Sequence, residues 1–412
     1  MAVPTAKEIM DFSPFNTGGK EEVPPFRRRL YSGLKEPTRH YIVALSGMRR
    51  VGKTTLLKQI LSESGGAYFS FDEQRYQNAE SLSQVLQVLL GEGFSTIVLD
   101  EIGGVQGWGG TLKKHYDRKK AKFYVSGSSS LGIRKGNESL AGRMFEYYLP
   151  PFQFDEYLEK NGWRQKERLW NMQQMPEELP AFLSAGSFPE IHGESPAVAR
   201  KYIETLADKV VYEDIPSRFG VEHRSKLSEL LRYCASFSAS MFSESQVANA
   251  LGISRGTVSE YLSHLHQCYM CTVVLEEGSY ARALQKSKKL FVSSPSLYWA
   301  LADSYSEGAA SEVAVFDRLV AWGKQPKFFR DYQKREVDFI VDGIPLEVKN
   351  RSFIGNADFE PLLHFMKKKK GDFGIMVTRD RFDLKKMEGA SILQVPLSVF
   401  LSCGNFETLL HP

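Results

Sequence analysis

The residues with the clearest chemistry lie near the start of the chain, where residues 47–54 read GMRRVGKT. This stretch matches the phosphate-binding loop G-x-x-x-x-G-K-[ST], in which glycines let backbone N–H groups face phosphate and the following helix adds its positive end. Lys53 is expected to reach the β- and γ-phosphates, and Thr54 to offer its hydroxyl to Mg²⁺. The stretch therefore predicts a nucleoside triphosphate site with contacts from Gly47, Val51, Gly52, Lys53, Thr54 and Thr55.

Two adjacent carboxylates follow the apolar run at residues 96–99. Asp100 and Glu101 would repel each other at the end of a buried strand. Their presence there is explained if they bind a cation or activate water. We assign Asp100 to the Mg²⁺ shell, with a helix N-cap as the alternative, and Glu101 to orienting or deprotonating the attacking water. Ser126, after the run at residues 122–125, is either a γ-phosphate sensor or a helix cap. Because no guanine-reading N-K-x-D sequence is present, ATP is favoured over GTP.

A second pair of carboxylates is brought together by a predicted hairpin. Residues 335–341 and 344–349 are β-type runs joined by the dipeptide Asp-Gly, which is a strong signal for a two-residue turn. Counting outward from that turn places Asp338 directly opposite Glu347, with Cβ atoms about 4.5–5.5 Å apart. Like charges at that distance destabilise a sheet, and a bridging Mg²⁺ or Mn²⁺ would compensate them.

Lys349 lies two residues after Glu347 and therefore on the same face of its strand. Together with Asp338, these residues reproduce the D…E-x-K arrangement of the PD-(D/E)xK nucleases, in which the acids hold metal and the lysine helps activate water. Glu312 is expected to open a helix and supply a further acidic ligand. The alternatives are a solvated face on which Lys349 pairs with Glu336, and a site that binds nucleic acid without cutting it.

The elements that position these residues follow from the hydrophobic pattern. After residue 54 the chain alternates strand-like runs with helical patterns, which predicts a parallel sheet with helices on its faces. Ligands of such sheets bind beyond the carboxyl ends of the strands. Near the C-terminus, a strand at residues 327–330, a helix near 358–369 and a strand at 374–378 complete an α-β-β-β-α-β unit around the hairpin.

Between these parts, residues 243–262 predict a helix-turn-helix with serine caps and a glycine turn, followed by strand material suited to a wing. If this unit reads DNA, Arg255, Thr257 and Ser259 would approach the major groove. The alternative is a packing domain that makes no base contacts.

Several stretches, taken in order, resemble a large prokaryotic group of AAA-type ATPases with a C-terminal restriction-endonuclease-like domain. They are GMRRVGKTTLL, IVLDEI with Trp108 after it, VSGSSS, SLAGRMFEYYLPPFQFDEYL and GSFPEI, and they extend over most of residues 20–350. The resemblance implies that Arg143 contacts the γ-phosphate in its own chain or from a neighbouring subunit, whereas the sequence alone equally allows a salt bridge. It likewise implies that Arg49 and Arg50 meet phosphate or a partner chain.

The expected fold class is therefore α/β with four domains. They are a P-loop AAA-type ATPase domain at residues 1–155, a helical lid or bridge at 156–221, a winged helix-turn-helix at 222–284 and a PD-(D/E)xK nuclease-like domain at 285–412. No apolar run approaches the roughly 20 residues of a membrane span, and no leader is evident. Four cysteines in 412 residues suggest no disulfide framework, so a cytoplasmic location is expected.

The expected function is ATP hydrolysis that gates access of DNA to a metal-dependent nuclease-like domain, with ATP and Mg²⁺ as cofactors and Mg²⁺ or Mn²⁺ at the second site. The alternative is a nucleotide-controlled scaffold that binds DNA or protein with a catalytically inactive nuclease-like domain. An ATPase acting on protein substrates is a third hypothesis. The formal net charge of +4 does not by itself indicate nucleic acid, and a homo-oligomer remains an open alternative.

Overall fold

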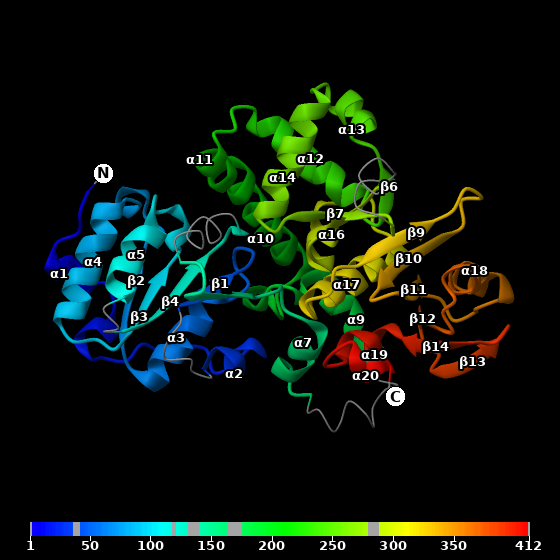
Figure 1. Ribbon diagram of the computed structural model, residues 1–412, viewed down its shortest axis with the longest axis horizontal. Helices are drawn as coiled ribbons and strands as arrows, with labels where there is room; N and C mark the ends of the chain where they lie inside the picture. Colours follow the sequence, from blue (N-terminus) through cyan, green and yellow to red (C-terminus); the bar gives the residue numbers. More distant parts are fainter. Residues whose placement is uncertain are drawn as a thin grey trace. The chain divides into compact units, whose positions relative to one another are not determined.

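The computed structural model describes residues 2–35, 42–117, 121–130, 140–163, 175–278 and 288–410. The chain forms two compact units, one of residues 1–149 with 267–269 and one of residues 150–266 with 270–412 (Figure 1). The end of the first unit lies close to the predicted end of the ATPase domain at residue 155. The division of the rest of the chain into three domains remains a prediction.

The first unit is built on a sheet of five parallel strands in the order β2-β3-β4-β1-β5. The predicted parallel sheet is confirmed. The strands are β1 (Ile42–Ser46), β2 (Ala67–Ser70), β3 (Thr96–Asp100), β4 (Lys122–Gly127) and β5 (Met144–Tyr148).

Helices cover both faces of this sheet. α1, α4 and α5 pack together against one face, and α2 packs on α3 at the other (Figure 1). In α4 the residues Leu82, Val85, Leu86 and Leu89 are buried, because their spacing places them on one side of a helix. The helices are α1 (Ala6–Asp11), η1 (Pro14–Thr17), α2 (Leu30–Lys35), α3 (Lys53–Ser64), η2 (Gln74–Tyr76), α4 (Ala79–Gly91), η3 (Ile102–Gly104) and α5 (Trp108–Tyr116).

The second unit begins with a largely helical part. Its helices are α7 (Phe154–Lys160), α9 (Met175–Ala181), η4 (Phe182–Gly186), η5 (Pro189–Ile191), α10 (Pro196–Lys209), η6 (Val210–Asp214), α11 (Ile215–Phe219), α12 (Arg224–Ser236), α13 (Glu244–Leu251), α14 (Arg255–Gln267) and α16 (Pro295–Leu301). The predicted helix pair is present as α13 and α14. Ser243 caps the first helix, and Gly252 ends it at a φ of 65°. Ser254 Oγ accepts a hydrogen bond from the Thr257 N–H at 3.0 Å and so caps the second helix.

A small antiparallel sheet in the order β6-β8-β7 accompanies the helix pair. Its strands are β6 (Ser240–Phe242), β7 (Cys271–Leu275) and β8 (Lys288–Val292). The last residues of the predicted wing strand, 279–284, lie outside the described residues. A pair of helices beside an antiparallel sheet is compatible with the winged-helix prediction, which remains a prediction.

The C-terminal part contains a mixed six-stranded sheet in the order β13-β14-β12-β11-β10-β9. The strands are β9 (Lys327–Arg330), β10 (Glu336–Val341), β11 (Ile344–Lys349), β12 (Phe373–Thr378), β13 (Asp383–Met387) and β14 (Ala390–Pro396). The helices are α17 (Glu307–Ala321), η7 (Asn356–Phe359), α18 (Glu360–Lys369), α19 (Leu397–Ser402) and α20 (Glu407–Leu410). The sequence predicted the first four of these strands in chain order and did not predict β13 and β14.

None of the helices in the described part of the chain is long and apolar enough to cross a membrane.

Candidate functional site

The phosphate-binding loop of the first unit joins the buried strand β1 to helix α3. Two glycines are required by this path. Gly47 has a φ of 155°, and a Cβ there would lie 2.4 Å from the Leu149 carbonyl oxygen. Gly52 has a φ of 96° and stands immediately before the helix, where its left-handed backbone aims the first N–H groups of α3 toward the loop. The strand, loop and helix predicted from the sequence are therefore all present.

Lys53 opens α3 and folds its side chain back over the loop. Its Nζ donates hydrogen bonds to the carbonyl oxygens of Gly47, at 2.9 Å, and Met48, at 3.0 Å. The same ammonium lies 3.8 Å from Glu101 Oε1. The lysine is thus held across the loop, in the position from which it would meet phosphate oxygens.

Asp100 ends β3 beside the loop, as expected, and is almost fully buried. The Thr54 hydroxyl donates to Asp100 Oδ2 at 2.7 Å, and the Tyr68 hydroxyl donates to the same oxygen at 2.7 Å. Ser126 Oγ donates to Asp100 Oδ1. The two residues assigned to the Mg²⁺ shell, Thr54 and Asp100, are therefore adjacent. Burial and the nearby Asp100 carboxylate raise the pKa of Tyr68.

Glu101 has a left-handed backbone and is held by two hydrogen bonds. Its backbone has a φ of 51°, a left-handed conformation that costs energy for a residue with a Cβ. Its N–H donates to Ser126 Oγ at 3.0 Å, and its Oε2 accepts from the Ser128 N–H at 3.1 Å. Strained backbone held by hydrogen bonds is a feature of positions where side-chain orientation matters.

These residues fit a nucleotide with Mg²⁺. A hydroxyl and a carboxylate of the kind that hold Mg²⁺ meet at the N-terminus of a 12-residue helix, where backbone N–H groups and the helix dipole favour anions. A lysine lies across the same loop. The donor set therefore suits a hard cation bridging phosphate oxygens.

The structure also shows where the other residues predicted to contact the nucleotide lie. Val51 is buried, and its carbonyl oxygen accepts a hydrogen bond from Arg28 at 2.6 Å. Thr55 lies in the first turn of α3. Arg49 lies 3.6 Å from Asp72, and Arg50 has a positive φ of 68° within the loop. Their contact with phosphate remains a prediction.

Arg143 is not brought to the loop within its own chain. It directly precedes β5 and pairs with Asp117 at 3.1 Å. Because Ile42 pairs with Met144, this arginine lies at the amino ends of the parallel strands, whereas the loop follows their carboxyl ends. The five residues of β1 separate the two places by roughly 16 Å at about 3.3 Å per residue. Contact from a neighbouring subunit remains a prediction.

The second candidate site lies in the C-terminal sheet, on the hairpin of β10 and β11. Val341 pairs with Ile344, as predicted, and the antiparallel register continues to Phe339 and Leu346. Asp342 and Gly343 form the turn with φ values of 51° and 85°, the positive values that a two-residue hairpin turn requires.

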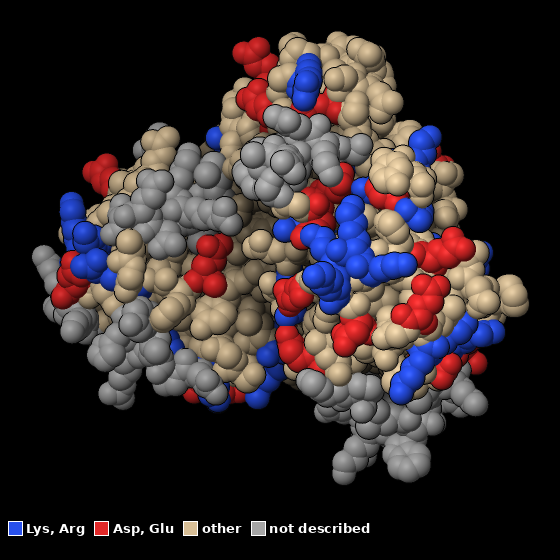
Figure 2. Space-filling view, turned by 45° about the vertical axis from the view of Figure 1, so that its right-hand side comes forward, with Lys and Arg blue, Asp and Glu red and all other residues tan. Residues whose placement is uncertain are grey.

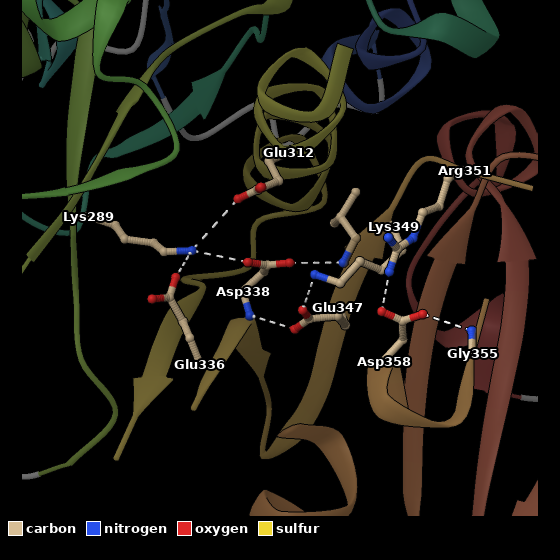
Figure 3. A network of polar contacts seen from close by, with 10 residues as sticks. Lys289, Glu312, Glu336, Asp338, Glu347, Lys349, Arg351, Gly355 and Asp358 are labelled. Carbon is tan, nitrogen blue, oxygen red and sulfur yellow. Dashed lines mark hydrogen bonds and ion pairs between the residues drawn. The ribbon is translucent and has the colours of Figure 1, made fainter. Parts of the chain in front are cut away.

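The hairpin register places Asp338 and Glu347 face to face, as the sequence predicted (Figure 3). The Asp338 N–H donates to Glu347 Oε2 at 3.2 Å, and Asp338 Oδ2 accepts from the Val348 N–H at 3.0 Å. Lys349 Nζ donates to Glu347 Oε1 at 2.6 Å. The alternative pairing of Lys349 with Glu336 is not what the structure shows.

A lysine that the sequence did not single out enters this cluster from β8. The side chain of Lys289 is only 2% exposed, and its Nζ lies 2.5 Å from Glu336, 3.1 Å from Asp338 and 3.7 Å from Glu312 (Figure 3). Glu312 lies in the second turn of α17, which begins five residues earlier than predicted. We call the four carboxylates Glu312, Glu336, Asp338 and Glu347, with Lys289 and Lys349, the acid cluster.

The charges of the acid cluster are not balanced by its lysines alone, since four carboxyl groups face two ammonium groups. Burial and the charge of Asp338 raise the pKa of Glu347 to about 8, and they outweigh the lowering effect of Lys349. Burial and Asp338 also raise the pKa of Glu312 well above its ordinary value. Burial would lower the pKa of Lys289, but Asp338, Glu312 and Glu336 outweigh that effect and raise it.

A divalent metal would have to share this space with Lys289. Both oxygens of Asp338 and both of Glu347 accept from N–H groups or ammonium groups of the chain. Glu312 Oε2 is buried without a hydrogen-bond partner and lies 3.7 Å from the Lys289 ammonium. Within the residues that the structure describes, no group of three or more His, Cys, Asp or Glu side chains is arranged to hold a metal. As arranged, the cluster fits a metal only if the Lys289 ammonium is displaced.

Sequence reasoning missed three residues of the two sites. Tyr68 and Arg28 reach the nucleotide loop from other segments, and Lys289 reaches the acid cluster from another sheet. Lys289 belongs to a run of lysines at residues 286–289, and such runs are typical of a solvated face.

Comparison with known protein families gives two matches along the chain. Residues 39–158 match a protein family described as an AAA domain. Residues 176–307 match a domain of unknown function, DUF8612. The chain therefore contains an AAA-type domain, whereas neither match describes a restriction-endonuclease-like domain.

One relative of comparable length matches most of the chain. The chain is 26% identical over 426 residues to the uncharacterized protein MJ1637 of Methanocaldococcus jannaschii, covering 90% of this chain and 88% of that protein. This similarity extends through both units.

Similar solved structures share little with the chain. One, described as the structural basis for katanin self-assembly, has 16% identity and a TM-score of 0.25 over 44% of this chain and 62% of that chain. Another, a STAND protein with a tetratricopeptide repeat sensor from Pyrococcus horikoshii, has 11% identity and a TM-score of 0.28 over 73% and 46%. The chain spans less than two thirds of either, and TM-scores this low support no further argument.

Proposed function

We propose that the first unit binds ATP with Mg²⁺ and hydrolyses it. The observation that carries this proposal is the contact of 2.7 Å between Thr54 and Asp100, beside a lysine that lies across the phosphate-binding loop. Hydrolysis, rather than binding alone, is supported by Glu101, whose carboxylate is oriented by the Ser128 N–H at the same end of the sheet. The match of residues 39–158 to an AAA domain agrees with this chemistry.

Each residue has a distinct task in the proposed reaction. The loop N–H groups and the start of α3 hold the phosphates, and Lys53 moves its hydrogen bonds from the loop carbonyls to phosphate oxygens. Thr54 and Asp100 would hold Mg²⁺, which neutralises charge on the phosphates when bound. Glu101 orients the attacking water and accepts its proton. Ser126 holds Asp100 and the backbone of Glu101 in place through its hydrogen bonds with them.

The test is phosphate release by the purified chain with ATP, with and without Mg²⁺. Mg²⁺-dependent release that follows ATP rather than GTP is the expected result. Tight binding of ATP without any release would limit the first unit to a nucleotide-controlled switch.

For the second unit, we propose binding of nucleic acid by the C-terminal sheet. Asp338, Glu347 and Lys349 have the spacing of the D…E-x-K pattern, and Lys349 ends β11 at the rim of the sheet. Two further functions remain predictions: reading of DNA by the helix pair, and ATP gating of access to the sheet. A homo-oligomer also remains a prediction.

Whether the second unit cuts nucleic acid depends on the cation in the acid cluster. The excess of carboxyl groups over ammonium groups supports a divalent ion, whereas Lys289, which pairs with three of these carboxylates, supports an inactive, nucleic-acid-binding unit. A plasmid nicking assay with Mn²⁺, using wild type and Asp338→Asn, decides between them. Cleavage lost in the variant supports the nuclease, and no cleavage by either protein supports the binding unit.

Gating by ATP is tested by the rate of cleavage. Equal rates of cleavage with ATP, with a slowly hydrolysed analogue and without nucleotide would contradict gating.

A further inference from the structure

One edge of the six-stranded sheet gathers three connections that are far apart in the sequence. Glu336 pairs with Arg330, and Lys349 pairs with Thr378. The turn after β9, the segment after β11 and the segment after β12 therefore leave the sheet at the same edge. The last two touch, because Arg381 Nε donates to the Ser352 carbonyl oxygen at 3.1 Å.

Each of these connections carries an exposed aromatic side chain. Tyr332 is 89% exposed, Phe353 77% and Phe382 53%, and these are the largest exposures of any large hydrophobic residue in the described part of the chain. Single exposed hydrophobic residues need no explanation, but three at one sheet edge mark a binding surface. We call these three residues the aromatic edge.

The same connections are rich in basic residues. Residues 330–335, 350–355 and 379–382 contain six basic side chains, Arg330, Lys334, Arg335, Arg351, Arg379 and Arg381, against Asp331 and Asp380. Arg351 and Arg379 are paired with Asp358 and Glu307, but both arginines are more than half exposed, and such pairs exchange readily for other anions. On the face of the second unit seen in Figure 2, Lys and Arg side chains gather in one area bordered by Asp and Glu.

A cavity beside this edge adds room for a ligand. It has a volume of about 530 Å³, within the range of ligand pockets, and Asn350 and Arg379 lie in its wall with the rings of Trp299 and Tyr305. Three residues of its wall, Asn350, Arg379 and Leu397, directly follow the parallel strands β11, β12 and β14, and ligands of such sheets bind at the carboxyl ends of the strands. Asn350 directly follows Lys349 and donates to Ser311, the neighbour of Glu312. The cavity and the acid cluster therefore share this part of the sheet.

We infer that the aromatic edge binds an unpaired nucleic acid strand, with bases stacked on Phe353, Phe382 and Tyr332 and phosphates met by the arginines. This inference deepens the nucleic-acid binding proposed for the second unit and rests on it. The faces of bases in a duplex are already stacked on one another, so exposed rings select a single strand. Stacking on aromatic rings tolerates any base, and the strand would run toward Lys349.

The test is fluorescence anisotropy with a labelled oligothymidine and with a duplex of the same length, using the full chain. Phe353→Ala combined with Phe382→Ala is expected to weaken single-strand binding by at least about 10-fold, because each stacked base contributes about 1–3 kcal/mol. Phe353→Trp keeps a stacking ring and is expected to retain affinity. Phe237→Ala is the control, since Phe237 is 45% exposed and follows α12 rather than this edge.

The outcomes separate the inference from the function it rests on. Two results would contradict single-strand binding by the aromatic edge while leaving nucleic-acid binding in place. One is a double alanine variant that binds the single strand as tightly as wild type does. The other is a wild-type protein that binds duplex as tightly as single strand. No binding of either nucleic acid by wild type would overturn both.

Discussion

Lys53→Ala is expected to abolish ATP turnover, with a loss of at least about 100-fold in the rate of phosphate release. In the structure, the Lys53 ammonium spans the loop between the carbonyl oxygens of Gly47 and Met48. Alanine removes the positive charge that would face the β- and γ-phosphates. Phosphate release at saturating ATP and the dissociation constant of ATP are the measurements.

Lys58→Ala is the matched control for this variant. Lys58 lies on the same helix, and its Nζ pairs with Glu21 at 2.5 Å on a partly exposed surface. Exposed ion pairs contribute about 0–1 kcal/mol, so this change should leave turnover intact. If Lys53→Ala and Lys58→Ala released phosphate equally fast, the loop would not be the site of hydrolysis.

Lys289→Met is expected to destabilise the second unit by about 3–5 kcal/mol in the absence of divalent ions. The reason is that Glu336 and Asp338 would lose the buried ammonium that lies within 3.1 Å of each. Methionine fills a similar volume without the charge. We further expect Mn²⁺ to raise the midpoint temperature of thermal unfolding of this variant but not of wild type, because the ion can occupy the space that Lys289 leaves.

Lys324→Met provides the comparison. Lys324 also bridges two carboxylates, Asp342 and Glu407, but both partners are more than half exposed. Its loss should change stability by less than about 1 kcal/mol, with no response to Mn²⁺. A Lys289→Met variant that unfolds like wild type and ignores Mn²⁺ would show that the lysine is not the resident cation of the acid cluster.

The parts of the two sites that rest on local spacing were predictable from the sequence. The strand, loop and helix around Lys53 lie within the continuous stretch of residues 42–64. The two residues of the Asp-Gly turn fix the register of β10 and β11. In both cases the chain geometry over a short distance determines which side chains meet. Opposition of Asp338 and Glu347 is therefore a direct consequence of the two-residue turn.

The parts that rest on tertiary packing were not predictable. Lys289 meets Asp338 from 49 residues earlier in the chain, and Tyr68 meets Asp100 from 32 residues earlier. No spacing rule connects such positions, because the sheet order decides which strands are neighbours. The same limit applies to Arg143: its residue type suits a phosphate contact, but only the position of β5 shows that it lies at the other end of the sheet.

The most direct test of the account is a side-by-side measurement of ATP binding and phosphate release for wild type and Glu101→Gln. The glutamine preserves the size and the hydrogen bond from Ser128 but cannot accept a proton from water. We predict that the variant binds ATP as tightly as wild type and releases no phosphate above background. Equal phosphate release by the two proteins would contradict the assignment of Glu101 and, with it, the proposed hydrolytic site.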